Sequence, residues 1–418
     1  MVEKDVDVAI IGGGMVGASL AVALARACPE LSITVLEAVD MPDTGAEAGF
    51  QPSYDMRSTA LSYGTRLIYE QLGLWDLLRE HVTPIERIHV SDRGQFGAAR
   101  LQARDYRLEA LGYVTPNQWM GRVLWAGLKQ YGNIQFRCPV QVRRVQHEPQ
   151  GVLLELAETG ATETVQRTLR AQLAILADGG RSGLRQQLGI QTEKRSYGQV
   201  ALITNVSSRK HHEFVAYERF TDQGPMALLP LGAGNLEDHR SVLIWTLPED
   251  RAQEVLEACD EQFLEMLGDR FGHRLGGFAQ VGSRHVYPLA LERALEQVRP
   301  GLVLVGNAAH SLHPVAGQGY NLAVREVMGL AELLAKAHRA GQWLGDLSLL
   351  SRYEQDQQED QLRTIVASDS LVRLFSNAKF PLTQARGAGL ITLDLVAPLK
   401  QTFARYAMGL GGREAVLA

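Results

Sequence analysis

The feature that most constrains this chain is a glycine-rich turn directly after a short apolar segment near the amino terminus. Residues 6–11 are rich in β-branched side chains and predict a buried strand. Gly12-x-Gly14-x-x-Gly17 follows at once, and the small apolar residues over 15–27 predict a helix. We expect Gly12 to permit the tight turn, Gly14 to let the backbone approach a ligand, and Gly17 to let the helix pack closely on the strand.

The chemistry expected at this turn is the binding of a dinucleotide. Free amides at the start of the helix, together with the helix dipole, favour a phosphate group. A second predicted strand, over 32–36, ends at Glu37, where a carboxylate would accept hydrogen bonds from ribose hydroxyls. A glycine turn beside an incidental surface glutamate is the alternative, and the pattern alone does not separate FAD from NAD.

Two later segments repeat the pattern of an apolar strand that runs into a glycine turn. Residues 170–177 predict a strand that ends in Asp178-Gly179, and residues 302–305 predict one that ends in Gly306-Asn307. Beyond the second strand lies Pro314-x-x-Gly317-Gln318-Gly319, and apolar residues then recur at helical spacing. The two glycines at the start of this helix would leave amides free to face a polar or anionic group.

In this order, the three segments resemble those of the class A flavin monooxygenases, the aromatic hydroxylases related to p-hydroxybenzoate hydroxylase. The resemblance spans nearly the whole chain. It implies that Asp178-Gly179 lies near the pyrophosphate groups of FAD and NADPH, that the Gly306 segment binds the ribityl chain, and that the Gly317 segment lays amides along the isoalloxazine ring. Most of the family has Asp where this chain has Asn307. An amide oxygen can still accept from a ribityl hydroxyl, without a charge-assisted bond worth about 1–2 kcal/mol more.

Within that family, the chain resembles the hydroxylases of ubiquinone biosynthesis. Residues 55–62 resemble their D-x-R-S-T-A-L block, and residues 89–94, 217–221 and 368–372 resemble the branch that acts on 2-octaprenyl-6-methoxyphenol. Arg122, expected to open a helix toward Leu128, matches the arginine that meets the FAD pyrophosphate. The cofactor contacts implied by the turns and by the resemblance are Gly12, Gly14, Gly17, Glu37, Arg57, Arg122, Asp178, Gly179, Gly306, Asn307, Pro314, Gly317, Gln318, Gly319 and Asn321.

The resemblance implies an FAD-dependent monooxygenase that takes electrons from NADPH or NADH and one oxygen atom from O2. Its expected reaction is hydroxylation of 2-polyprenyl-6-methoxyphenol para to the phenol group, giving 2-polyprenyl-6-methoxy-1,4-benzoquinol. Three alternatives stay open: a sister hydroxylase acting at another ring carbon, a polyprenyl-binding flavoprotein reductase, and a non-catalytic prenyl carrier like the Rab GDP-dissociation inhibitors. The sequence names no catalytic side chain and no acceptor for the proton of the phenol.

The expected fold is an α/β architecture with a Rossmann-like FAD-binding domain, an inserted mixed β-sheet substrate domain and C-terminal helices. The FAD-binding domain is expected from 1–75, 100–185 and 284–345, and the substrate domain from 76–99 and 186–283, where short strand-like runs alternate with turns. Residues 346–418 form the helical region. The end of this region is mildly basic and has two interpretations. It forms a helix that closes the fold, or it forms a docking surface for other enzymes of the pathway or for the inner membrane face.

Composition excludes several other classes of protein. A formal net charge of −5 gives no basic field for nucleic acid, and three widely separated cysteines indicate a reducing compartment, the cytoplasm. The apolar run over 8–25 follows acidic residues and contains three consecutive glycines, so we reject a signal peptide and a membrane span. His310 and His313 lack a third ligand, so no metal site is expected. Ser182 and Ser311 lack the context of a hydrolase nucleophile.

Overall fold

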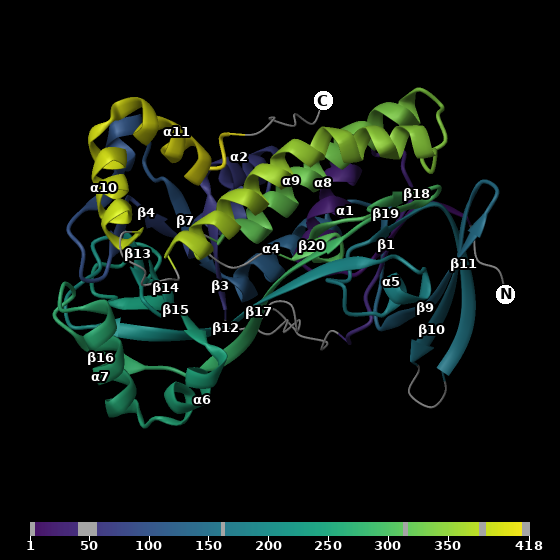
Figure 1. Cartoon of the computed structure of the whole chain (residues 1–418). Helices are drawn as coiled ribbons and strands as arrows, with labels where there is room; N and C mark the ends of the chain where they lie inside the picture. Colours follow the sequence, from purple (N-terminus) through teal and green to yellow (C-terminus); the bar gives the residue numbers. More distant parts are fainter. Residues whose placement is uncertain (1–4, 41–56, 160–163, 312–316, 376–381, 412–418) are drawn as a thin grey trace.

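The computed structural model describes residues 5–40, 57–159, 164–311, 317–375 and 382–411 (Figure 1). Its centre is an eight-stranded sheet with five parallel strands in the order β19-β11-β1-β2-β8. These strands are β1 (Val6–Ile11), β2 (Ile33–Leu36), β8 (Ile134–Arg137), β11 (Thr164–Leu176) and β19 (Leu302–Leu304). Antiparallel strands extend the sheet: β9 (Val140–Glu148), β10 (Gly151–Thr159) and β18 (Val298–Arg299).

The register of the parallel strands aligns their carboxyl ends at one edge of the sheet. Ile11 of β1 lies opposite Leu36 of β2 and opposite Leu176 of β11. Leu176 in turn lies opposite Leu304 of β19. Because strands with this register end together, the segments that follow them start from neighbouring points.

Helices cover one face of this sheet. α1 (Met15–Ala27) packs against α4 (Asn117–Lys129) and α8 (Gln318–Arg339). Residues 17–25 of α1 are all buried, because small side chains on several of its faces let the helix lie close to both the sheet and α8. The apolar run 8–25 is therefore a strand, a turn and a core helix. Among the described residues, no helix combines the length and the apolar character that crossing a membrane needs.

A second, nine-stranded sheet has the order β20-β17-β12-β15-β14-β13-β5-β6, with β16 paired to β12. Its strands are β5 (Arg87–Asp92), β6 (Ala98–Gln102), β12 (Thr192–Ser208), β13 (Val215–Thr221), β14 (Gly224–Pro230), β15 (Arg240–Pro248), β16 (Phe278–Val281), β17 (His285–Ala294) and β20 (His310–Ser311). The β13–β5 pair is parallel and the others are antiparallel, so the sheet is mixed, and the expected α/β fold class is confirmed.

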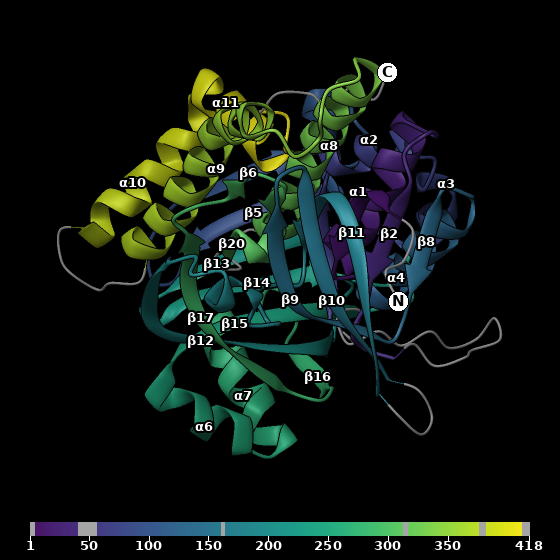
Figure 2. The ribbon, with the colours of Figure 1, turned by 90° about the vertical axis from the view of Figure 1, so that its right-hand side faces the viewer.

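The two faces of the nine-stranded sheet have different neighbours. On one face, Leu243 and Trp245 pack with Phe263 of the α6–α7 pair, α6 (Glu249–Glu257) and α7 (Asp260–Phe271) (Figure 2). The opposite face packs Leu229 and its neighbours against a three-stranded sheet, β3 (Ser58–Ser62), β4 (Thr83–Ile85) and β7 (Gly112–Pro116). That second face is thus turned toward the parallel-sheet unit.

Three carboxyl-terminal helices lie beside both units: α9 (Leu347–Phe375), α10 (Leu382–Leu395) and α11 (Ala397–Ala407). α9 packs along α8, and α10 packs on β5 and β6. A buried ion pair joins α10 to the sheet, with 2.9 Å between Arg386 Nε and Asp92 Oδ2. The helical region is therefore anchored to the nine-stranded sheet by charge as well as by apolar packing.

Candidate functional site

The turn after β1 is built so tightly that two of its positions require glycine. The Gly12 amide donates to Leu36 O at 2.8 Å, and Gly12 has a φ of +108°. A Cβ on Gly12 would lie 2.6 Å from Ala177 O, and a Cβ on Gly17 would lie 2.0 Å from Gly12 O. Both contacts are with backbone atoms that cannot move aside, so the close approach of turn, helix and neighbouring strand depends on these glycines.

Glu37 closes this turn from the end of β2. Its Oε2 accepts from the Gly13 amide at 2.7 Å and its Oε1 from the Val39 amide at 2.9 Å. Gly14 is the N-cap of α1, and no side chain within the described part of the chain caps that helix. The carboxylate keeps acceptor capacity for a sugar hydroxyl, and the amides of α1 remain available to a phosphate.

The turn after β11 is shaped by Asp178. Its carboxylate accepts from the Gly180 amide at 2.9 Å, from the Ser182 amide at 3.0 Å, and from the Ser182 hydroxyl. Gly179 and Gly180 have φ values of +70° and +73°, a conformation that glycine adopts without strain. Asp178 therefore fixes a backbone turn next to Gly12, since Ala177 is the residue that Gly12 touches.

The turn after β19 meets the other two. The Val305 amide donates to Leu176 O at 3.0 Å, and a Cβ on Gly306 would lie 3.1 Å from the side chain of Val16 in α1. Asn307 is exposed at this edge, and its carbonyl oxygen lies 3.4 Å from the Cβ position of Gly180. Three turns that lie far apart in the sequence thus converge at the carboxyl edge of the parallel sheet.

The start of α8 lies against β3. Gly317 is its N-cap with a φ of +61°, and a Cβ there would lie 3.3 Å from the Cβ of Ala60. Gln318 is buried in the first turn. No atom of the described residues lies within 4 Å of a Cβ built on Gly319. Pro314, the remaining position of this motif, lies outside the described residues.

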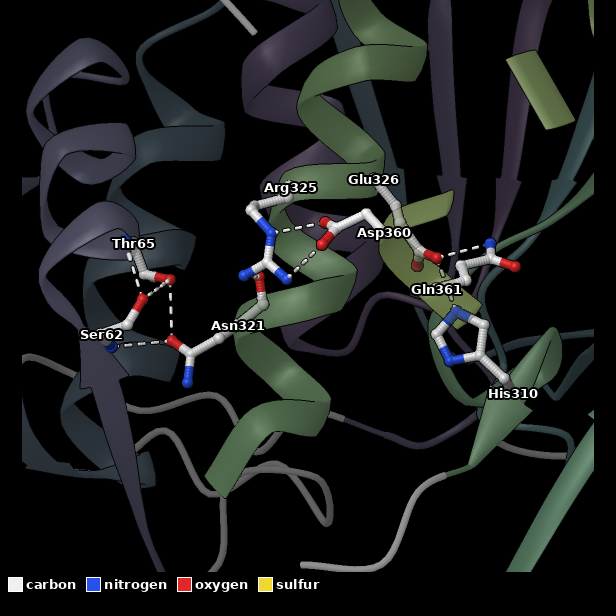
Figure 3. Close-up of polar contacts among 8 residues, drawn as sticks. All are labelled: Ser62, Thr65, His310, Asn321, Arg325, Glu326, Asp360 and Gln361. Atoms are coloured by element: carbon white, nitrogen blue, oxygen red, sulfur yellow. Dashed lines mark hydrogen bonds and ion pairs between the residues drawn. The ribbon is translucent and has the colours of Figure 1, made fainter. Parts of the chain in front are cut away.

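The side-chain amide of Asn321 joins α8 to β3 by hydrogen bonds that use all of its donors and acceptors (Figure 3). Its Oδ1 accepts from the Ser62 amide at 2.8 Å and from Thr65 Oγ1 at 2.7 Å. Its Nδ2 donates to Ala60 O at 2.9 Å and to Gly317 O at 2.8 Å. Because these bonds use the whole side-chain amide and Asn321 O accepts from Arg325, the backbone amide of Asn321 is the group left for the cofactor contact, which stays a prediction.

A second buried network holds the other side of α8 (Figure 3). His310 Nε2 lies 2.6 Å from Glu326 Oε1, which also accepts from Gln361 of α9 at 2.7 Å. Burial alone would lower the pKa of His310, but the carboxylate of Glu326 outweighs burial and raises that pKa. His310 is therefore part of the packing around α8. No cluster of three or more metal-binding side chains occurs among the described residues, and His313 lies outside them.

The two arginines expected near the cofactor lie on aromatic rings. The guanidinium carbon of Arg57 lies 4.8 Å from the ring centre of Tyr287, and that of Arg122 lies 4.7 Å from the ring centre of Trp119. The helix that carries Arg122 begins at Asn117 and not at Arg122: Pro116 is its extended N-cap, and the Asn117 amide, which has no partner within the helix, donates to Arg57 O at 2.8 Å. The expectation that Arg122 opens this helix was wrong.

The residues present fit FAD. The turn after β1 leaves helix amides for the pyrophosphate, Glu37 offers a ribose acceptor, and the Asp178 and Gly306 turns extend the site along the same edge. Sequence reasoning missed the network around Glu326 and Gln361. A single acidic residue between Val324 and Val327, on the apolar face of a helix, was the available signal, because a buried carboxylate needs a partner.

Comparisons with known proteins agree with this geometry. A family model described as "FAD binding domain" matches residues 5–361. Ubiquinone hydroxylase UbiL of Rhodospirillum rubrum is 37% identical over 410 residues, covering 97% of this chain and 90% of the relative. The 3-demethoxyubiquinol 3-hydroxylase of Escherichia coli is 30% identical over 411 residues, covering 98% and 100%.

The fold is also found in solved structures. That of p-nitrophenol 4-monooxygenase PnpA from Pseudomonas putida aligns with a TM-score of 0.77 at 19% identity, covering 99% of this chain and 100% of that one. That of PqsL, a probable FAD-dependent monooxygenase from Pseudomonas aeruginosa, aligns with a TM-score of 0.73 at 20% identity, covering 93% and 99%. The match of the family model, the identity to whole-length relatives and the converging turns lead to one conclusion: the chain belongs to the FAD-binding family of flavin-dependent monooxygenases, in the branch that includes the ubiquinone-biosynthesis hydroxylases.

Proposed function

We propose that this protein is the FAD-dependent hydroxylase of a polyprenylated phenol in ubiquinone biosynthesis, with NADPH or NADH as electron donor and O2 as oxygen donor. The observation that carries the proposal is the convergence of three glycine turns at one sheet edge, with a largely apolar sheet face turned toward that unit. When bound, FAD supplies the electron transfer and the activation of oxygen that no side chain can supply.

The contacts we assign to FAD follow from the position of each turn. Gly12, Gly14 and Gly17 admit the pyrophosphate to the start of α1, and Glu37 accepts from the adenosine ribose. The remaining assigned contacts lie along the same edge and at the start of α8 and α4: Arg57, Arg122, Asp178, Gly179, Gly306, Asn307, Pro314, Gly317, Gln318, Gly319 and Asn321. The amides at the start of α8 would stabilise negative charge that develops on a bound ring.

The sheet face opposite α7 supports an aromatic and polyprenyl substrate. Ile203, Leu229 and Ile244 on this face are apolar and lie between the nine-stranded sheet and the three-stranded sheet. An apolar surface of this kind favours a hydrophobic ring and helps to exclude water from the reacting atoms. Exclusion of water matters because water at the reacting atoms would let activated oxygen be lost before it reaches the substrate, which wastes reducing equivalents.

For the substrate, we propose 2-polyprenyl-6-methoxyphenol, hydroxylated para to its phenol group. A second candidate, hydroxylation at another ring carbon, is favoured by the relative named 3-demethoxyubiquinol 3-hydroxylase, which spans this chain at 30% identity. Lipid extracts of a strain lacking this gene separate the two. Accumulation of 2-polyprenyl-6-methoxyphenol supports the first, and accumulation of a later intermediate, whose ring already carries oxygen para to the phenol group, supports the second.

Two simple measurements separate a hydroxylase from other uses of the fold. The purified protein should be yellow and should consume O2 when a farnesylated phenol and NADPH are added together. A reductase would oxidise NADPH without using O2 in proportion to product, and a prenyl carrier would stay colourless even after incubation with FAD. Either of those results would contradict the proposal.

We also propose that the C-terminal helices bring the enzyme to lipid, from which a polyprenyl substrate must come. Ile391, Leu395 and Leu399 expose 41%, 76% and 50% of their surface on α10 and α11. Adjacent exposed apolar side chains on helix ends suit shallow insertion at a membrane surface. Replacing these three residues by serine should reduce co-sedimentation with anionic vesicles and leave FAD content unchanged; equal co-sedimentation would contradict the assignment.

A further inference from the structure

Glu218 of β13 is the one carboxyl in the row of paired residues that runs from Ile203 of β12 to Val90 of β5. The strand register places Ile203 opposite Ile244, and Ile244 opposite Ala227. Ala227 lies opposite Glu218, which lies opposite Val90 of β5. Residues opposite one another in a sheet project their side chains to the same face. The carboxyl therefore lies between Ala227 and Val90, and Ile244 and Ile203 follow on the same face of the sheet.

That face is covered by two neighbours: the three-stranded sheet, and α10, whose Leu390 packs with Val90 and Phe220. Ala216, two residues before Glu218, packs with Ile85 of β4 and Val114 of β7. Tyr217, which points to the opposite face, packs instead on Phe271 of α7, with 5.5 Å between ring centres. Since side chains alternate along a strand, Glu218 points away from α7, on the side assigned above to the substrate.

The carboxyl of Glu218 has no protein partner. Within the described part of the chain, no hydrogen bond or ion pair reaches it, although the side chain is partly accessible. Burial among protein atoms raises its pKa to about 8, and no charged neighbour contributes to that shift.

Three carboxylates of the described elements near this face have partners of their own: Asp92 pairs with Arg386, Asp394 with Lys400, and Asp369 accepts from Tyr197. An unpaired carboxyl on an apolar surface destabilises the fold. An unpaired carboxyl at the assigned substrate face is therefore a candidate for a chemical role.

We propose that Glu218 contacts the phenol oxygen of the substrate and accepts its proton. The inference rests on the proposed function and names the residue that the reaction needs. In this step the phenol O–H bond breaks and an O–H bond forms on the carboxylate. The electron pair stays on the phenol oxygen and is delocalised into the ring, so its ortho and para carbons become more nucleophilic. The step consumes no oxidant, since O2 and NAD(P)H supply the oxygen atom and electrons.

The environment of Glu218 matches that role. A carboxylate whose pKa lies near 8 is a stronger base than an exposed glutamate and still ionises at the pH of the cell. Its apolar neighbours leave the phenol oxygen as the polar group available to it, which would orient the ring as well as activate it. The polar contact would thus fix which ring carbons face the flavin.

The test compares the FAD-loaded wild type with Glu218→Gln and with Glu237→Gln, the same change at an exposed glutamate of the same sheet unit. The probe is 2-farnesyl-6-methoxyphenol in detergent micelles with NADPH and O2. We expect Glu218→Gln to retain FAD and to lower kcat/KM by about 10²–10⁴-fold, the usual contribution of a general base. The pH profile should lose its limb near 8, and ultraviolet difference spectra should show the bound phenol ionising at higher pH. Glu237→Gln should match the wild type.

A further variant, Glu218→Asp, separates a chemical role from a structural one. It retains a base with shorter reach, so it should keep the pH limb at reduced rate. If Glu218→Asp behaves like Glu218→Gln, or if Glu218→Gln keeps wild-type kcat/KM and pH profile, the assignment of Glu218 is wrong while the proposed function stands. If the wild type hydroxylates no polyprenyl phenol, the proposed function fails and the role of Glu218 falls with it.

Discussion

Replacing Asn321 by leucine should loosen the junction between α8 and β3, because leucine has a similar volume and none of the hydrogen-bonding groups. The change leaves the Ser62 amide, the Thr65 hydroxyl and the carbonyls of Ala60 and Gly317 without the partners they now have at 2.7–2.9 Å. With about 0.5–1.5 kcal/mol for each hydrogen bond, the loss is about 2–6 kcal/mol.

Urea unfolding followed by circular dichroism measures this loss, and gel filtration followed by flavin absorbance measures FAD retention. We expect the free energy of unfolding to fall by at least about 2 kcal/mol, and FAD to be lost more readily, since Gly317 and the start of α8 are no longer held against β3. Thr65→Val, which removes one of the four bonds to Asn321, should cost about 1 kcal/mol.

The double variant tests whether these groups act as one network. Combined with Asn321→Leu, Thr65→Val should cost less than it does alone, because its partner is already absent. A fall of less than 1 kcal/mol for Asn321→Leu, or strict additivity in the double variant, would refute the view that this amide joins α8 to β3.

Three further perturbations follow from the structure. Gly17→Ala places a Cβ 2.0 Å from Gly12 O, so it should lower FAD affinity at least about tenfold in a fluorescence titration. The control is Gly268→Ala, whose Cβ meets nothing within 4 Å beyond its chain neighbours and its own helix backbone. It should leave the free energy of unfolding unchanged or raise it by up to about 1 kcal/mol. Burial raises the pKa of Glu218 from 4.5 to about 8, so the folded state binds its proton more tightly than the unfolded state. The free energy of unfolding should therefore fall as pH rises between those values. In urea titrations, Glu218→Gln should reduce that fall by up to about 5 kcal/mol. The same pH dependence in the wild type and in Glu218→Gln would contradict this. Arg386→Leu leaves the Asp92 carboxylate buried without its partner and should destabilise the protein by about 3–5 kcal/mol at neutral pH, and unchanged urea unfolding would count against that role for the ion pair.

Sequence reasoning was most successful where each element carries its own signal. The strand over 6–11, the helix over 15–27 and the strands that end before Asp178 and Gly306 agree with β1, α1, β11 and β19, because a buried strand followed by glycines has few alternative folds. The convergence of these turns also follows, since parallel strands share one carboxyl edge. What local patterns did not reveal is pairing across long distances.

The parallel pairing of β5 with β13 is the clearest case. Residues 87–92 lie beside residues 215–220, and nothing in either segment specifies the other. The same holds for side chains: His310 was weighed as a metal ligand, yet its partners Glu326 and Gln361 come from α8 and α9. Contacts of this kind depend on tertiary packing, which propensity and spacing do not encode. Glu218 lies in the segment 217–221 that carries the resemblance, but its role could not be inferred from sequence, because the apolar character of its surroundings appears only once the strands are paired.

The position of β19 in the parallel sheet has a consequence for how the protein folds during its synthesis. This strand pairs with β11 only after the ribosome has made β12 to β17, the six strands of the nine-stranded sheet that lie between β11 and β19 in the chain. Until then, the nascent chain has an open sheet edge and an unfinished nucleotide site, so flavin cannot be captured stably while most of the polypeptide is being synthesised. The amount of FAD present when the chain leaves the ribosome should therefore affect how much of the newly made protein escapes aggregation and proteolysis.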